Sequence, residues 1–372
     1  MKTAFLISCS DHYSHRMHLW DSGLQSLGYR TRYITSDFDH NTKVQFTSSV
    51  PGAVQIPVMP YRKNLSVSRI LSHRMFAKKA KKYLQQHKPD VVIALLPPNF
   101  LAHYLAQYKK KHPGTVLIFD IFDLWPESFP SNNLKSLLSP AFSVWGNLRD
   151  RNLSKADFIT VECELFRRKL CLPDAGSATV YLSAEPVPAV SAQLSSDTIE
   201  LCYLGAINNI IDMDAICALL IDIHRHKPVR LHIIGAGEQA DTFVQRARAT
   251  GAEVEFHGAI YDTEKKQQIL RRCHFGLNIM KSSVCVGLTM KSVDYFRFGL
   301  PIINNIPGDT AEMVKNRHIG LPIDNTCGQQ IANMSPEQFL EMRSHVQALF
   351  DATFAEATLL KQIEELLKNI ID

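Results

Sequence analysis

The sequence has no hydrophobic run long enough to cross a bilayer. Its longest apolar stretch, residues 91–102, is interrupted by Pro97 and Pro98, whereas a spanning helix needs about 20 apolar residues. The apolar residues 4–7 are too few for a signal peptide and run directly into polar residues. We therefore expect a cytoplasmic protein that is soluble or peripheral on the inner face of a membrane.

The sequence also lacks any Cys-x-x-Cys pair. Its eight cysteines are scattered through apolar contexts, which favours reduced, buried thiols in a cytosolic protein over disulfides. Three histidines, His12, His15 and His18, recur every three residues and would share one side of a helix. No acidic partners accompany them, so polar lining is favoured over a metal site, and neither a metal nor a cofactor is expected.

Acidic residues are absent from residues 62–88, where nine Lys or Arg residues occur, and Lys109, Lys110 and Lys111 follow. One interpretation is a solvated helix face. Another is a surface that attracts anionic lipid headgroups, with about 1 kcal/mol per basic residue. Nucleic acid is a weaker alternative because no recognition motif or interleaved aromatic residue accompanies the charge.

The remaining pattern is typical of two α/β domains. A chain of 372 residues is long for one domain and ordinary for two. Short β-branched runs alternate with amphipathic, helix-length segments in two blocks, which predicts two doubly wound, Rossmann-like domains facing a central cleft. We expect an amino-terminal domain at residues 1–183, a linker at 184–198, a second domain at 199–345 and a final helix at 346–372 that packs back toward the first domain.

Two motifs follow predicted strands in the second block. Gly235-Ala236-Gly237 lacks the third glycine of a dinucleotide fingerprint, so a tight strand-to-helix turn is favoured over a cofactor site. The more informative segment is residues 281–305, in which a loop of small residues leads into a predicted helix at 289–298. Amides at the start of that helix, near Gly287, Leu288 and Thr289, would favour a bound anion.

The same segment resembles the donor-binding helix of glycosyltransferase family four. The resemblance rests on Lys291-x-x-Asp294-Tyr295 and on a Gly-Leu-Pro-Ile-Ile strand at residues 299–303. It implies that Asp294 binds the ribose of a nucleotide sugar and that Lys291 or Lys281 meets its phosphates. Val286 stands where the family usually has a first glutamate.

Further segments resemble the family in order and spacing. Gly205 ends the strand that opens the second domain, and Gly258 and Tyr261 lie where the family's loop holds the nucleobase. After the strand that ends at Gly205, members of the family usually have an Arg and a Lys that bind the donor phosphates. Here residues 206–212 read Ala-Ile-Asn-Asn-Ile-Ile-Asp instead. The resemblance covers nearly the whole chain.

In the first block, residues 123–128 read Asp-Leu-Trp-Pro-Glu-Ser directly after a predicted strand. This resembles a segment of bacterial surface-polysaccharide glycosyltransferases in the same family. By that resemblance Asp123 and Glu127 line the acceptor side, and Asp123 orients or deprotonates the acceptor hydroxyl. The alternative is that Asp123 caps the following turn and Trp125 packs under it.

The resemblance implies a GT-B glycosyltransferase of the hexosyltransferase type that uses a uridine nucleotide donor and retains the configuration of the transferred sugar. A saccharide or lipid-linked oligosaccharide of capsule, exopolysaccharide or O-antigen synthesis would be the acceptor. Two alternatives share the architecture: a sugar-nucleotide epimerase, and a non-catalytic partner subunit. No nucleic-acid partner is expected.

Overall fold

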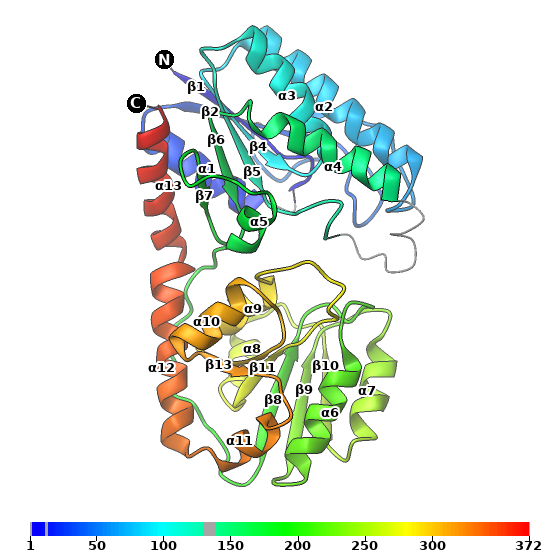
Figure 1. Cartoon of the computed structure of the whole chain (residues 1–372), viewed down its shortest axis with the longest axis vertical. Coiled ribbons are helices and arrows are strands. Elements are labelled where there is room, and N and C mark those ends of the chain that lie inside the picture. The colour runs from blue at the N-terminus through cyan, green and yellow to red at the C-terminus, as the bar shows by residue number, and fades with distance from the viewer. Residues whose placement is uncertain (1, 12–13, 129–138, 372) are drawn as a thin grey trace. The chain divides into compact units, whose positions relative to one another are not determined.

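A computed structural model describes residues 2–11, 14–128 and 139–371 (Figure 1). His12, one of the three histidines at three-residue spacing, lies outside these ranges. The chain divides into two compact units. Unit 1 comprises Met1–Tyr181 and Ala357–Asp372, and unit 2 comprises Leu182–Glu356.

Unit 1 is built on a parallel sheet of seven strands in the order β3-β2-β1-β4-β5-β6-β7. The order reverses between β1 and β4, which pair with each other at the centre of the sheet. The strands are β1 (Thr3–Ile7), β2 (Arg30–Ser36), β3 (Val54–Ile56), β4 (Val91–Leu96), β5 (Val116–Ile121), β6 (Phe158–Val161) and β7 (Ser177–Thr179).

Helices cover the sheet of unit 1, and the carboxyl-terminal helix is one of them. They are α1 (Ser14–Ser26), α2 (Val67–His87), α3 (Phe100–Lys111), α4 (Ser139–Leu153), α5 (Glu164–Lys169) and α13 (Glu356–Ile371). Ile363 of α13 is fully buried in a core that includes Trp20 of α1. Gly23 makes this contact possible, because a Cβ atom there would lie 2.9 Å from the Ile363 Cγ2 atom.

Unit 2 contains a second parallel sheet, of six strands in the order β10-β9-β8-β11-β12-β13. Here the order reverses between β8 and β11. The strands are β8 (Ile199–Leu204), β9 (Val229–Ile234), β10 (Glu253–Gly258), β11 (Phe275–Asn278), β12 (Ile302–Asn304) and β13 (Gly320–Pro322).

The helices of unit 2 are α6 (Met213–His224), α7 (Ala240–Arg248), α8 (Thr263–Leu270), α9 (Met290–Arg297), α10 (Asp309–Arg317), α11 (Cys327–Asn333) and α12 (Pro336–Thr353). Side chains cap several of them. Asp212 accepts from the Ala215 N–H at the start of α6, and Ser335 and Gln338 form a reciprocal capping box at α12.

The two α/β sheets confirm the predicted fold class. Central strands such as β4 and β8 are buried along their whole length, as expected for parallel strands covered by helices. The sequence pattern missed the short helices α5 and α11, of six and seven residues. Segments of this length are too short to show helical periodicity. Within the part of the chain that the structure describes, no helix is both long and apolar enough to traverse a bilayer.

Candidate functional site

Three glycines lie side by side at the carboxyl edge of the sheet in unit 2. Gly205 follows β8, Gly235 follows β9 and Gly258 ends β10. The Gly205 N–H donates to the Ile234 oxygen at 2.9 Å, and the Gly235 N–H donates to the Gly258 oxygen at 2.8 Å. A Cβ atom on Gly235 would lie 2.0 Å from the Gly205 oxygen. Gly235 is therefore needed for close backbone packing between the ends of β8 and β9.

Helix α9 begins at the same edge of the sheet. Thr289 caps it, accepting from the Ser292 N–H at 3.1 Å, while its hydroxyl donates to the Asn278 side-chain oxygen at the end of β11. Gly287 is buried, and its carbonyl oxygen accepts two hydrogen bonds from Thr310. These contacts fix where the helix starts. They also occupy the Thr289 hydroxyl, and Leu288 is buried beside it.

Lys291 leaves the first turn of α9 toward the glycine edge. Its Cε atom lies 4.0 Å from the position of a Cβ on Gly205. Its Nζ atom donates to the Tyr203 hydroxyl at 3.2 Å and lies 4.3 Å from the centre of that ring. Burial lowers the pKa of Lys291 to about 8, because no carboxylate compensates the ammonium group.

Asp294 lies one turn further along α9, on the same side of the helix as Lys291. Burial raises the pKa of Asp294, while the charges of Lys266 and Arg297 oppose the rise. Among the residues that the structure describes, none donates a hydrogen bond to this carboxylate. A half-buried acceptor without a partner is suited to a ligand hydroxyl.

Tyr295 of the same motif has a structural role. Its hydroxyl accepts from the Leu204 N–H at 2.8 Å and donates to the Cys202 oxygen at 3.1 Å. Its ring packs so closely on β11 that a Cβ on Gly276 would lie 2.6 Å from it. Tyr295 therefore anchors α9 to β8 and β11. This contact fixes the position of Lys291 and Asp294 relative to the sheet.

The other predicted donor-binding residues have fewer contacts. Lys281 and Tyr261 are exposed, Tyr261 by 89%. Lys281 is held through its backbone, which donates to the Ile210 oxygen at 2.9 Å. Gly258 has a φ of 68°, a conformation that favours glycine.

In unit 1, the predicted acidic residues follow β5 and are already engaged. Asp123 accepts a short hydrogen bond from the Ser128 hydroxyl, and burial raises the pKa of Asp123. Glu127 forms an ion pair with the fully buried Arg149, with a nitrogen–oxygen distance of 2.8 Å. Asp123 thus caps the turn, and its action on the acceptor hydroxyl stays a prediction.

A pocket of about 40 Å³ opens at the point where the strand order of unit 1 reverses. It lies past the ends of β1 and β4, which is where doubly wound sheets bind ligands. Residues from the strand ends and from α2 line it, among them Ser10, Arg69, His73, Pro97 and Trp125.

Arg69 and His73 of α2 are the pocket residues that sequence reasoning missed. The Arg69 guanidinium lies 4.3 Å from the centre of the Trp125 ring, and the His73 ring stacks on the same indole. Burial lowers the pKa of His73 well below its usual value, and the charge of Arg69 adds to the effect. Both residues lie at helical spacing with Phe76 and Leu84, and all four are buried. This spacing in the sequence is the signal from which their inward-facing position could have been predicted.

Arg16 of α1 is also buried. It makes two hydrogen bonds of 2.7 Å to the Asp120 carboxylate, which also accepts from Trp20 and Thr160. Arg16 is therefore part of the core of unit 1.

Two doubly wound units of this kind define the GT-B class of folds, and comparison with known proteins agrees. Residues 198–337 match the family model described as "Glycosyl transferases group 1". No curated protein matches the sequence. The matched part of the chain, residues 198–337, is a group 1 glycosyltransferase domain, and the whole chain has the GT-B fold.

Solved structures resemble the whole chain at low sequence identity. Sucrose-phosphate synthase from Thermosynechococcus elongatus is 13% identical with a TM-score of 0.72, covering 100% of this chain and 99% of the other. The lipopolysaccharide outer core galactosyltransferase WaaB is 14% identical with a TM-score of 0.70, covering 99% of both. Anabaena HepE, solved in complex with UDP-glucose, is 14% identical with a TM-score of 0.63, covering 99% of this chain and 100% of the other. These likenesses concern the fold.

Proposed function

We propose that this glycosyltransferase moves a hexose from a UDP-linked donor to a saccharide or lipid-linked oligosaccharide, with retention of configuration, in surface-polysaccharide synthesis. The observation that carries the proposal is the pairing on α9 of a half-buried cation with a half-buried carboxylate, at an edge lined by glycine backbone. Lys291 would neutralise the diphosphate, and Asp294 would accept hydrogen bonds from the ribose.

Gly205 and Gly258 support this assignment because they let a nucleotide approach the backbone closely. The start of α9 adds a partial positive charge. Negative charge develops on the departing diphosphate during transfer, so groups that stabilise it lower the barrier directly. The relative HepE was solved with UDP-glucose, which supports uridine as the base.

We assign the acceptor to the surface around the pocket of unit 1, because about 40 Å³ is too little to enclose a sugar ring. Trp125 and Tyr61 offer aromatic faces there, and Arg69 offers a buried cation. Aromatic faces and a guanidinium suit a sugar ring that carries an anionic substituent. Asp123, close to Trp125 in sequence, would take the proton of the attacking hydroxyl.

A thermal-shift screen of the full chain against UDP, GDP, ADP and UDP-sugars tests the donor site. A ligand that binds only the native state raises its apparent stability by RT ln(1 + [L]/Kd). UDP should raise Tm in the wild type, and Asp294→Ala should remove the rise. Asp241→Ala, an exposed acid of α7, is the matched control and should keep it. A UDP-induced rise that survives Asp294→Ala would contradict the assignment.

The acceptor lipid is supported by a surface at the start of α2. Exposed apolar residues, Val67 (72%), Ile70 (41%) and Leu71 (43%), adjoin exposed basic residues at Arg62 and Lys63. Apolar insertion together with basic charge is the combination that attaches proteins to anionic membranes.

Sedimentation with phosphatidylglycerol vesicles tests this surface. Arg62→Gln combined with Lys63→Gln should reduce binding, as should Val67→Ser combined with Ile70→Ser. Lys315→Gln with Arg317→Gln, which removes two exposed cations from unit 2, should bind as the wild type does. Equal binding by all of the variants would remove α2 from the proposal.

A further inference from the structure

Two histidines and a glutamate converge on one face of the edge strand β10 and its neighbour β9. Glu255 pairs with His232 across the two strands, so their side chains share a face, and His257 lies two residues beyond Glu255 on the same face. His232 is fully buried, whereas the His257 side chain is 22% exposed and that of Glu255 36%. Solvent therefore reaches the three side chains from the side of His257 and Glu255.

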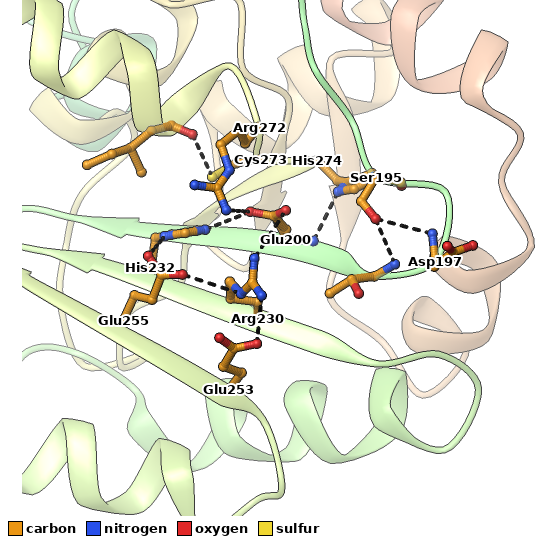
Figure 2. A network of polar contacts seen from close by, with 12 residues as sticks. Ser195, Asp197, Glu200, Arg230, His232, Glu253, Glu255, Arg272, Cys273 and His274 are labelled. Carbon is orange, nitrogen blue, oxygen red and sulfur yellow. Dashed lines mark hydrogen bonds and ion pairs between the residues drawn. The ribbon is translucent and has the colours of Figure 1, made fainter.

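The hydrogen bonds of His232 orient one ring nitrogen toward its two neighbours. The His232 Nε2 atom lies 2.8 Å from the Glu200 carboxylate, so the proton belongs on Nε2. Figure 2 shows Glu200 between His232 and Arg272. The Nδ1 atom is then left with its lone pair, facing His257 and Glu255. A carboxylate behind a histidine is the usual orienting partner of a metal ligand.

Three ligand atoms form a triangle with sides suited to a small cation. His232 Nδ1 lies 3.1 Å from His257 Nε2 and 3.4 Å from Glu255 Oε2, and the latter two atoms are 3.8 Å apart. The point equidistant from all three corners of that triangle is about 2.0 Å from each, which follows from the three sides. Zinc binds histidine nitrogen at roughly 2.0–2.1 Å and carboxylate oxygen at roughly 2.0–2.2 Å.

We propose that His232, Glu255 and His257 bind a divalent transition-metal ion of the zinc type, with water completing the coordination. Two histidines and one carboxylate are a donor set that zinc accepts. This site is separate from Lys291 and Asp294 and takes no part in the transfer step. Its ion would fasten the edge strand β10 to β9.

The surrounding charges are compatible with a bound dication. The Arg230 Nε atom lies 3.4 Å from Glu255 Oε1, which leaves Oε2 for the metal. Arg230 also pairs with Glu253 at 2.8 Å, and Arg272 with Glu200 at 3.2 Å, so each guanidinium is already matched by a carboxylate (Figure 2). Glu200, Glu253 and Glu255 face only two guanidinium groups, so one negative charge is left over, and that favours a cation.

Zinc titration of the chelator-treated full chain tests the site, with a chromophoric chelator reporting free zinc. Thiolates are zinc ligands and the chain has eight cysteines, so the readout is the difference between variants with identical cysteines. His257→Gln and Glu255→Gln should each lose one equivalent of tight binding, with a fall in affinity of at least tenfold. Glu253→Gln, on the same face of the same strand, should lose none.

Two further measurements keep the test decisive. Zinc should raise the Tm of the wild type and slow hydrogen exchange in β10, and neither effect should occur in His257→Gln, whose metal-free Tm should match that of the wild type. Anomalous scattering at the zinc edge should place the ion among the three side chains. If His257→Gln binds as much zinc as the wild type, or if the wild type binds none tightly, the proposal is wrong and the group is a hydrogen-bonded histidine pair.

Discussion

Lys291 rests its ammonium group on Tyr203, 3.2 Å from the hydroxyl oxygen and 4.3 Å from the ring centre. No carboxylate pairs with it among the described residues, and burial lowers its pKa to about 8. An ammonium group held in this way keeps its charge available for an incoming diphosphate. The same feature makes donor binding sensitive to mildly alkaline pH.

UDP affinity should be constant below pH 8 and should fall above it, by up to tenfold per pH unit. The reason is that free Lys291 loses its proton near pH 8 and then no longer attracts the phosphates. Calorimetric titration with UDP from pH 6.5 to 9.5 measures this dependence. Lys291→Met should bind more weakly at pH 7 and should lack the change near pH 8. A wild-type affinity that is flat across this range would contradict the role of Lys291.

Lys291 should also destabilise the folded protein at neutral pH. Its pKa is near 8 in the folded state and 10.5 when unperturbed, so the unfolded state binds more protons between these values and stability rises with pH there. Lys291→Met should be more stable than the wild type at pH 7, by up to about 3 kcal/mol. That advantage should shrink toward pH 10, as measured by urea unfolding. An advantage independent of pH would point to packing instead.

Gly235→Ala should disrupt the glycine edge. The new Cβ would meet the Gly205 oxygen at 2.0 Å, so the backbone after β8 has to move, at a cost of about 1–3 kcal/mol. The UDP-induced rise in Tm should shrink as well, because Gly205 adjoins Lys291. Gly114→Ala, where nothing lies within 4 Å of the added Cβ, is the control and should change neither quantity.

Asp123 and Glu127 should respond differently to removal of their charge. Asp123→Asn can still accept from Ser128, so the fold should persist while the transfer rate falls by about 10²–10⁴. Glu127→Gln weakens the pairing of buried Arg149, so it should lower the unfolding free energy by about 1–3 kcal/mol and retain more activity. Transfer from UDP-sugar to an acceptor pool, measured beside urea unfolding, separates the two. Full activity in Asp123→Asn would leave Asp123 with its turn-capping role alone.

The buried pair of Arg16 and Asp120 should matter far more to stability than a surface pair. Asp120→Ala leaves a buried guanidinium without its two hydrogen bonds of 2.7 Å, which should cost about 3–5 kcal/mol in urea unfolding. Asp174→Ala removes an ion pair with Arg167 from a side chain that is 91% exposed and should cost about 0–1 kcal/mol. Similar costs for both would show that the core tolerates an unpaired Arg16.

Much of the fold could be predicted from the local pattern of apolar and polar residues. The alternation of β-branched runs with helix-length segments predicted the α/β architecture of both units, because such runs and helical periodicity are properties of adjacent residues. The motif at Lys291 and Asp294 was likewise visible, since both residues lie on one helix. The sequence does not show, however, how deeply Lys291 is buried. Its lowered pKa results from that burial and therefore could not be predicted.

The sequence by itself determined the α/β class, the division into two blocks and the motif that marks the family. Only the tertiary structure brings His232 of β9 next to His257 of β10. It also places Arg69, one of the basic residues of 62–88, in a pocket beside Trp125. Such contacts depend on strand order and register, and these are settled by the packing of segments far apart in the chain. A linear pattern of residue types does not contain them.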